Sequence, residues 1–219
     1  MFRTMKKTLS ILFLLMLTIS GMAQKKTLSA TLYRQFKPSV VTLYDGRRIN
    51  QSLTNVFLKN SSLLYLKGEY TMEANMDNIL AVDFDDRKFV AINKQLAYLV
   101  DSVGSNALFC IELFDKETYE RNLKNNINIS NISLGDQIST STVDLNTEDD
   151  YKLPVFRHFY YRLNGEYVKV HERDLAQKLP KEKRVMMKRI IALPDFSWQK
   201  DDSLMQLLKA ISDKPDSKD

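Results

Sequence analysis

The sequence predicts an α+β fold in which an antiparallel β-meander, either a curled sheet or a small barrel, precedes three C-terminal helices. From residue 39 to residue 115, short apolar runs alternate with turn residues, and helical periodicity is absent. After residue 172, apolar residues recur at helical spacing between prolines. Strands and helices that occupy separate stretches of chain are typical of an α+β domain.

Residues 1–23 have the three parts of a secretory signal peptide. Three basic residues precede the apolar run Leu9–Ile19, and Gly21-Met22-Ala23 forms a small-x-small cleavage site. We therefore expect a mature chain that begins at Gln24 and has no transmembrane segment. Its expected location is the periplasm, or alternatively the outside or the surface of the cell.

The charge of the chain changes when the signal peptide is removed. Residues 1–23 carry three of the 32 Lys and Arg residues and none of the 27 Asp and Glu residues, so the mature chain has 29 cations against 27 acids, a net charge of +2. A nearly neutral, exported chain is not the composition of a nucleic-acid-binding protein. We expect no nucleic-acid partner.

The expected β domain covers residues 24–171, and its first hairpins are indicated by their turn residues. The predicted strand pairs are Val40–Tyr44 with Arg47–Asn50 around Asp45-Gly46, Leu63–Leu66 with Glu69–Met72 around Lys67-Gly68, Ile79–Phe84 with Phe89–Ile92, and Leu96–Val100 with Ala107–Phe114. A loop is expected at residues 101–106. The only cysteine, Cys110, lies within an apolar run and is expected to be a buried thiol.

Residues 116–152 have a different composition, rich in Asn, Ser and Thr, and are expected to form an exposed insertion in the β domain. The helical segment is expected at residues 172–212, and a disordered tail at residues 213–219.

The stretch HFYYRLNGEYVKVH at residues 158–171 is typical of a β-hairpin that turns at Asn164-Gly165. With those two turn residues, Arg162 faces Tyr167, Tyr160 faces Lys169, and the chain's two histidines, His158 and His171, face each other at the open end. Because side chains alternate along a strand, one side of the hairpin is predicted to be buried. Its members are Phe159, Tyr161, Leu163, Val168 and Val170.

The other side of the hairpin is the best candidate for a partner-binding surface. It carries His158, Tyr160, Arg162, Tyr167, Lys169 and His171. Arg162 with Tyr167, and Tyr160 with Lys169, are expected to form cation–aromatic pairs. The two histidines suggest a metal site, a pH-sensitive pair or an ordinary solvated face. The last interpretation is preferred, since a zinc site needs at least three ligands and the neighbouring cations repel a metal ion.

The C-terminal segment is expected to contain helices at Glu172–Lys178, at Lys181–Ala192 and from Asp201 onward. Four apolar residues of the third, Leu204, Leu207, Leu208 and Ile211, form a stripe expected to pack on the sheet. The second helix is expected to have a basic face with Lys181, Arg184 and Lys188 and an opposite apolar face with Met186, Met187, Ile190 and Ile191. Such a helix can lie on a membrane surface, but docking on the globular domain is the preferred interpretation.

Motifs of common enzymes, cofactor sites and metal sites are missing from the sequence, so we assign no catalytic residue, cofactor or metal ligand. The favoured function is therefore that of a non-enzymatic interaction protein that contacts a protein or glycan. The alternative is a hydrolase of glycans or peptides that uses paired carboxylates, because the spacing of such a pair is set only in three dimensions.

The junction Gly-Met-Ala-Gln and the segment ERDLAQKLPKEKRVMMKRIIAL resemble parts of uncharacterised exported proteins of gut Bacteroidetes. The resemblance implies export but no functional residue. It also implies a covalent modification, since Asp101-Ser102-Val103 and Asp202-Ser203-Leu204 are similar to the acceptor tripeptide for O-glycosylation in that group. Ser102, in an expected loop, is the better candidate, and Ser203 is expected to serve as a helix cap.

Overall fold

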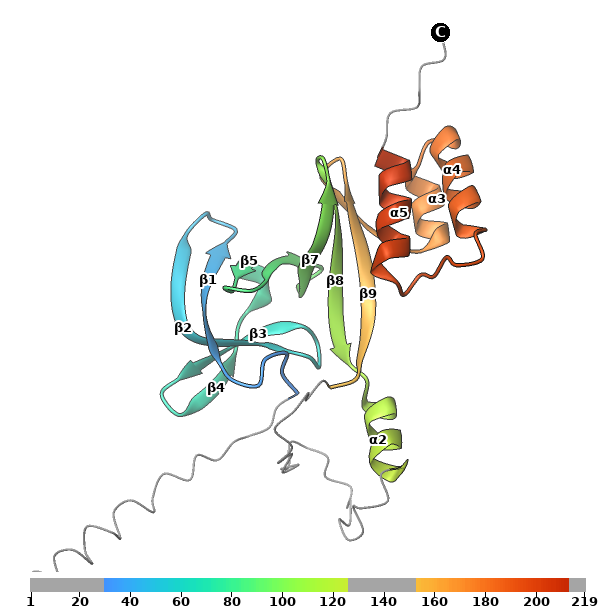
Figure 1. Cartoon of the computed structure of the whole chain (residues 1–219). Coiled ribbons are helices and arrows are strands. Elements are labelled where there is room, and N and C mark those ends of the chain that lie inside the picture. Colours follow the sequence, from blue (N-terminus) through green and yellow to red (C-terminus); the bar gives the residue numbers. More distant parts are fainter. Residues whose placement is uncertain (1–29, 126–152, 213–219) are drawn as a thin grey trace, which may run out of the picture. The chain divides into compact units, whose positions relative to one another are not determined.

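Ten strands form one antiparallel sheet in the computed structural model, which describes residues 30–125 and 153–212 (Figure 1). The strand order is β10-β9-β8-β7-β6-β5-β1-β2-β3-β4. The α+β class and the antiparallel meander with C-terminal helices are therefore confirmed. The expected signal peptide, the segment 126–152 and the tail 213–219 lie outside the described residues.

The strands differ in length from the predicted ones, and several are nine or ten residues long. Their bounds are β1 Lys37–Leu43, β2 Arg48–Phe57, β3 Ser62–Lys67, β4 Tyr70–Glu73, β5 Ile79–Asp83, β6 Lys88–Ile92, β7 Gln95–Val103, β8 Asn106–Phe114, β9 Val155–Leu163 and β10 Glu166–Lys169.

Two of the predicted turns have a different geometry. Between β1 and β2, only Gly46 has a positive φ, +85°, and Leu43 donates its amide hydrogen to the carbonyl of Arg47 at the ends of a three-residue loop. That loop is not the predicted type I′ turn, which needs positive φ at two positions. Between β3 and β4, Lys67 pairs with Tyr70, so Gly68 is the first turn residue instead of the second.

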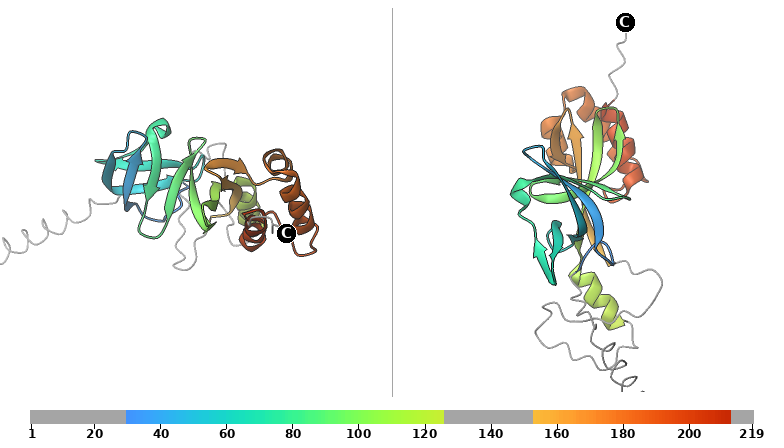
Figure 2. Two further views of the ribbon diagram at one scale, coloured as in Figure 1. Left: turned by 90° about the horizontal axis from the view of Figure 1, so that it is seen from above. Right: turned by 90° about the vertical axis from the view of Figure 1, so that its left-hand side faces the viewer.

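The sheet is curled, so that the loop between β2 and β3 contacts β7 and β8. Ser61 accepts the amide hydrogen of Leu96 on β7 at its carbonyl, and its hydroxyl donates to the Leu96 carbonyl at 2.7 Å. Phe114 of β8 donates its amide hydrogen to Leu58. The ladder stays open, since β10 and β4 each pair on one side only (Figures 1 and 2). The curled sheet is thus the observed alternative.

Four α-helices and one 3₁₀ turn, η2 at Met76–Asn78, accompany the sheet in the described ranges. The C-terminal helices are α3 Glu172–Lys178, α4 Lys181–Ile191 and α5 Asp201–Ser212, close to their predicted bounds. The first residues of the expected insertion form helix α2 at Lys116–Asn125, which was not predicted. Asp115 caps it, since its carboxylate accepts the amide hydrogen of Thr118 at 2.9 Å, which lowers the Asp115 pKa.

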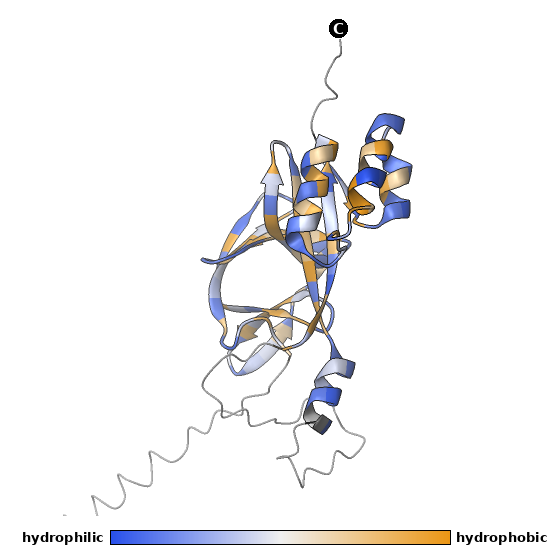
Figure 3. Cartoon of the chain, turned by 45° about the vertical axis from the view of Figure 1, so that its right-hand side comes forward, coloured by the Kyte–Doolittle hydropathy of each residue, from blue (hydrophilic) through white to orange (hydrophobic). Residues whose placement is uncertain are grey.

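Helix α5 covers the β7–β9 part of the sheet with the predicted apolar stripe. Leu204, Leu207 and Leu208 are fully buried against Leu108 and Cys110 of β8. Phe196 and Trp198 pack edge to face beside this core, with their ring centres 4.9 Å apart. Figure 3 shows the resulting mixture of hydrophobic and hydrophilic residues along the helices.

Helix α4 packs on this core with a narrower face than predicted. Met187 is fully buried, and Ile190 and Ile191 are packed against the core. Met186, expected on the same face, is 38% exposed. Docking of the helix is confirmed, but the assignment of Met186 to the docked face is wrong, because residues 186 and 187 lie about 100° apart around a helix.

Candidate functional site

The hairpin of β9 and β10 has the predicted register. Arg162 pairs with Tyr167 and Tyr160 pairs with Lys169. Asn164 and Gly165 have φ values of +51° and +88°, as a type I′ turn requires.

The two sides of the hairpin are also as predicted. Phe159, Tyr161 and Val168 are buried, between 0% and 6% exposed, and they pack against the helices. The opposite side is partly or fully exposed. We call this side the hairpin face, and it consists of His158, Tyr160, Arg162, Tyr167 and Lys169.

His171 does not belong to the hairpin face, so the predicted pairing of the two histidines is wrong. The ladder of β10 ends at Lys169, and the amide of His171 donates back to the Lys169 carbonyl as the chain turns. His171 is then the N-cap residue of α3, with its Nδ1 3.8 Å from the carboxylate of Asp174. His158 instead lies opposite Ile111 of β8.

A buried apolar floor adjoins the hairpin face. Phe109 of β8 lies opposite Tyr160 and is 3% exposed, although it is on the side that was expected to be solvated. Ala107 and Ile111 are buried beside it. The unbroken apolar run at residues 107–111 is the signal for this floor, because a strand buried on both faces lacks the polar alternation of a half-exposed strand.

Arg162 lies over this floor. Its guanidinium carbon is 5.7 Å from the centre of the Phe109 ring, and Tyr167 packs edge to face on the same ring at 5.6 Å. The cation–aromatic contact of Arg162 is therefore with Phe109, diagonally across the ladder, and not with the expected Tyr167. Neither a contact between Arg162 and Tyr167 nor one between Lys169 and Tyr160 occurs among the cation–aromatic pairs of the described residues.

No acceptor for the guanidinium of Arg162 lies within the described parts of the chain. Its Nε atom is buried and unpaired. A partly buried guanidinium on an apolar floor gains strongly from a carboxylate, which accepts two parallel hydrogen bonds from it. The hairpin face therefore presents an arginine that is suited to bind a carboxylate, and Tyr160 and Tyr167 lie on the same face.

The positive charge of the hairpin face comes from Arg162 and Lys169. Burial, followed by the nearby Lys169 ammonium, lowers the pKa of His158 below its usual 6.5. His158 is thus uncharged at neutral pH, and the face carries no carboxylate at the positions paired with it on β8 and β10.

Ser102, the candidate for O-glycosylation, lies in β7 and not in the expected loop. It pairs with Ala107, and the connection to β8 is only Gly104-Ser105. Ala107 in turn pairs with Arg162, so exposed Ser102 stands in one row with Arg162 and Tyr167 across four strands. Ser203, expected to cap α5, is buried in its first turn and accepts the amide hydrogen of Ser197 at 3.3 Å.

A second group of polar residues lies on the inward side of the sheet, and the sequence reasoning missed it. Arg157 of β9 donates to Asp201 of α5 at 2.8 Å and to the hydroxyl of Tyr98 at 3.0 Å. The Tyr98 hydroxyl is 3.4 Å from the carboxylate of Glu112, to which it donates. Burial opposes the charge of Arg157, but the hydrogen bonds that it donates to Asp201 and Tyr98 outweigh this effect and raise the Arg157 pKa.

The position of Arg157 could have indicated this group. It shares a side of β9 with Phe159 and Tyr161, and a charged side chain on an apolar side requires a partner. The group links β7, β8, β9 and α5 through hydrogen bonds within the protein, although Nε of Arg157 and Oδ1 of Asp201 are buried without a hydrogen-bond partner. We interpret it as structural.

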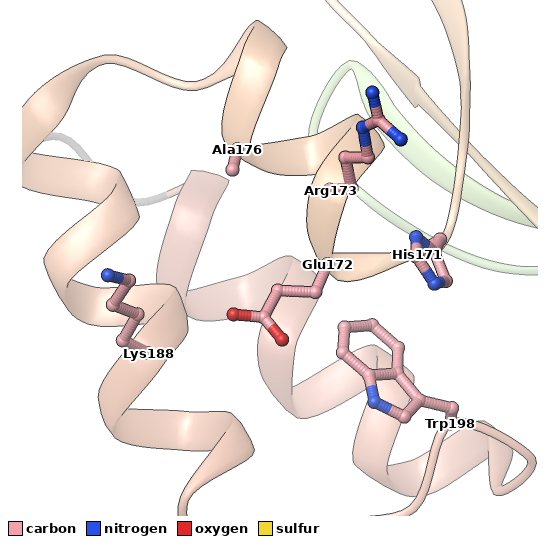
Figure 4. A pocket seen from close by; sticks show the side chains of 6 residues that line it. All are labelled: His171, Glu172, Arg173, Ala176, Lys188 and Trp198. Atoms are coloured by element: carbon pink, nitrogen blue, oxygen red, sulfur yellow. The ribbon is translucent and has the colours of Figure 1, made fainter.

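An open groove of about 450 Å³ lies between α3, α4 and the segment before α5 (Figure 4). It is lined by His171, Glu172, Arg173, Ala176, Lys188 and Trp198. Glu172 is its only carboxylate, whereas the hydrolase alternative needs two that converge. In residues 30–125 and 153–212, no three His, Cys, Asp or Glu side chains are grouped as a metal site.

Comparison with known proteins identifies no relative. No protein-family model, curated protein or solved structure matches the chain. None of the helices that the structure describes is long and apolar enough to cross a membrane.

Proposed function

We propose that the protein is an exported interaction protein, of the periplasm or the cell surface, whose hairpin face binds an acidic segment of a partner protein. The observation that carries this proposal is the guanidinium of Arg162, which lies partly buried over Phe109 without an acceptor in the described residues. A carboxylate of the partner would accept hydrogen bonds from the Nη atoms of Arg162, because its Nε atom is buried out of reach.

The composition of the hairpin face supports a protein partner. Tyrosine and arginine are enriched where proteins bind one another, and they contribute much of the binding energy. Tyr167, 39% exposed, adds aromatic area beside the guanidinium, and Lys169 adds a second cation at the rim. An acidic glycan offers the same carboxylates and is the second candidate.

Titration of the isotope-labelled mature chain with a glutamate-rich peptide tests the proposal. We expect amide resonance shifts that concentrate on β8, β9 and β10. Arg162→Gln should weaken the interaction by about 10-fold or more, because a charge-assisted, bidentate hydrogen bond contributes roughly 1.5–3 kcal/mol. The matched control is Arg173→Gln, which removes an exposed arginine of α3 and should leave the affinity unchanged.

Shifts confined to other strands, or equal affinity of the Arg162→Gln and wild-type chains, would overturn the assignment. Stronger binding of oligogalacturonate than of the peptide, with the same loss in Arg162→Gln, would identify an acidic glycan as the ligand. Export is tested separately: the protein recovered from the periplasm or the cell surface should have Gln24 as its first residue.

A hydrolase function has no comparable support in the described residues. The groove beside α3 presents only Glu172. The interaction function is therefore preferred.

A further inference from the structure

Helix α4 carries a second charged surface, which is separate from the hairpin face. The helix is held to the domain by one side only. Met187 is buried on that side, and the ammonium group of Lys183 donates a hydrogen bond to the carbonyl of Ile211 at the end of α5. Lys183 is thus engaged within the protein.

The remaining side of α4 is exposed to solvent and strongly basic. We call it the α4 basic face, and it consists of Lys181, Glu182, Arg184, Val185, Met186, Lys188 and Arg189. The face has four cations and one acid, Glu182. None of the four takes part in an ion pair among the described residues, whereas Lys178 of the preceding helix is paired with Glu166 at 2.9 Å.

Two apolar side chains lie among these cations. Val185 is 47% exposed and Met186 is 38% exposed. Val185 is two residues from the buried Met187, about 200° around the helix axis, so it points away from the core. An exposed valine in the middle of a cationic helix surface has no packing role within the described domain.

We propose that the α4 basic face binds the surface of an anionic lipid bilayer, with α4 parallel to the membrane plane and the rest of the domain behind it. Lysine and arginine side chains are attracted to anionic headgroups, while exposed apolar residues between them enter the headgroup region. The long, exposed cations are spread over the helix surface, which suits a diffuse negative surface better than a single carboxylate. This proposal does not rest on the function of the hairpin face.

Sedimentation of the chain from Gln24 onward with lipid vesicles tests the proposal. This chain contains every described residue and lacks the apolar run Leu9–Ile19, which would itself enter vesicles. It should bind vesicles of equal parts phosphatidylglycerol and phosphatidylcholine and should not bind phosphatidylcholine alone. Binding should weaken as salt is added, because exposed charges are screened.

Two variants assign the binding to the α4 basic face. Arg184→Gln with Lys188→Gln should reduce partitioning roughly 25-fold, since each cation near an anionic membrane contributes about a fivefold change. The matched control, Arg121→Gln with Lys124→Gln, removes the same charge from the exposed surface of α2 and should leave partitioning unchanged. Circular dichroism of both variants verifies that they are folded.

A third variant separates insertion from charge alone. Val185→Ser with Met186→Ser keeps every cation and should lower the binding that remains at high salt. Equal binding to neutral and anionic vesicles, or equal losses in the α4 and α2 variants, would overturn the proposal. So would binding to soluble polyglutamate without any binding to anionic vesicles, which would identify α4 as a protein-binding surface.

Discussion

The hydroxyl of Tyr161 donates a hydrogen bond of 2.6 Å to the backbone carbonyl of Leu204. Both residues are fully buried, and they join the inward side of β9 to the first turn of α5. Burial raises the pKa of Tyr161, so the phenol is protonated and acts as a donor at neutral pH. The same tyrosine side chain is thus part of the apolar core and a polar link between sheet and helix.

Replacing Tyr161 by Phe should destabilise the fold by about 1 kcal/mol, because the hydrogen bond is lost while the ring and its packing remain. Urea unfolding followed by fluorescence measures this change. Tyr167→Phe is the matched control, since Tyr167 is exposed on the hairpin face, and its unfolding midpoint should not move. An unchanged midpoint for Tyr161→Phe would mean that the hydrogen bond contributes nothing to stability.

The ion pair of Arg157 and Asp201 should show a coupling energy of about 0.5–1 kcal/mol in a double-mutant cycle. The variants are Arg157→Met, Asp201→Asn and the double variant, each measured by urea unfolding. The expected value is modest because the side chains are 26% and 39% exposed and solvent screens their attraction. A coupling energy of zero would contradict a structural role for the pair.

Cys110 should react with thiol reagents only when the protein unfolds. Burial raises the pKa of its thiol to about 11, and the residue is fully buried beneath α5, so little thiolate forms and no reagent reaches it. Mass spectrometry should find no alkylation of the native protein and complete alkylation in urea. Ser105→Cys, in the exposed turn between β7 and β8, should gain one label at once. Rapid native labelling of Cys110 would contradict the packing of α5.

His158 should make the fold less stable in mild acid. Its pKa in the folded protein lies below the 6.5 of the unfolded chain, so below that pH the unfolded state takes up the proton more readily. Stability should therefore be constant above about pH 6.5 and fall as the pH drops toward the lowered value.

Urea midpoints measured above and below that pH check the expectation. His158→Gln should remove this part of the pH dependence. Lys169→Gln should bring the His158 resonance closer to its usual titration, since the Lys169 ammonium contributes to the shift after burial. Titration of His158 at or above 6.5 in the wild-type chain would contradict the prediction.

The β9–β10 hairpin shows which features local sequence signals predict and which they do not. Asn164-Gly165 specifies the turn, and alternation then assigns Phe159 and Tyr161 to the buried side. These inferences use only residues near one another in sequence. The same reasoning failed at His171, because the chain leaves the ladder after Lys169 to begin α3. A local pattern shows that two residues can pair, but not that the strand continues that far.

Only part of the candidate site was predicted, because local patterns do not show which distant strands will pair. The residues of the hairpin face, apart from His171, were found from alternation. The position of Arg162 over Phe109 was not, because the two residues are 53 positions apart and meet only when β9 pairs with β8. Helix α2 had a local signal, the capping residue Asp115 three residues before Thr118. The Asn-, Ser- and Thr-rich composition of residues 116–152 led us to overlook it.

Local sequence signals predict the antiparallel strands, the β9–β10 register, the helices after residue 172 and the charge of their surfaces. Dihedral preferences, turn residues and side-chain periodicity act over a few residues, so the chain specifies them locally. Three features depend on the assembled fold: the contact of Ser61 with Leu96 in the curled sheet, the burial of β8 on both faces, and the packing of α4 through Met187 with Val185 left exposed. Burial depends on contacts between segments that are distant in sequence. An apolar surface is removed from water only by the segment that the fold packs against it.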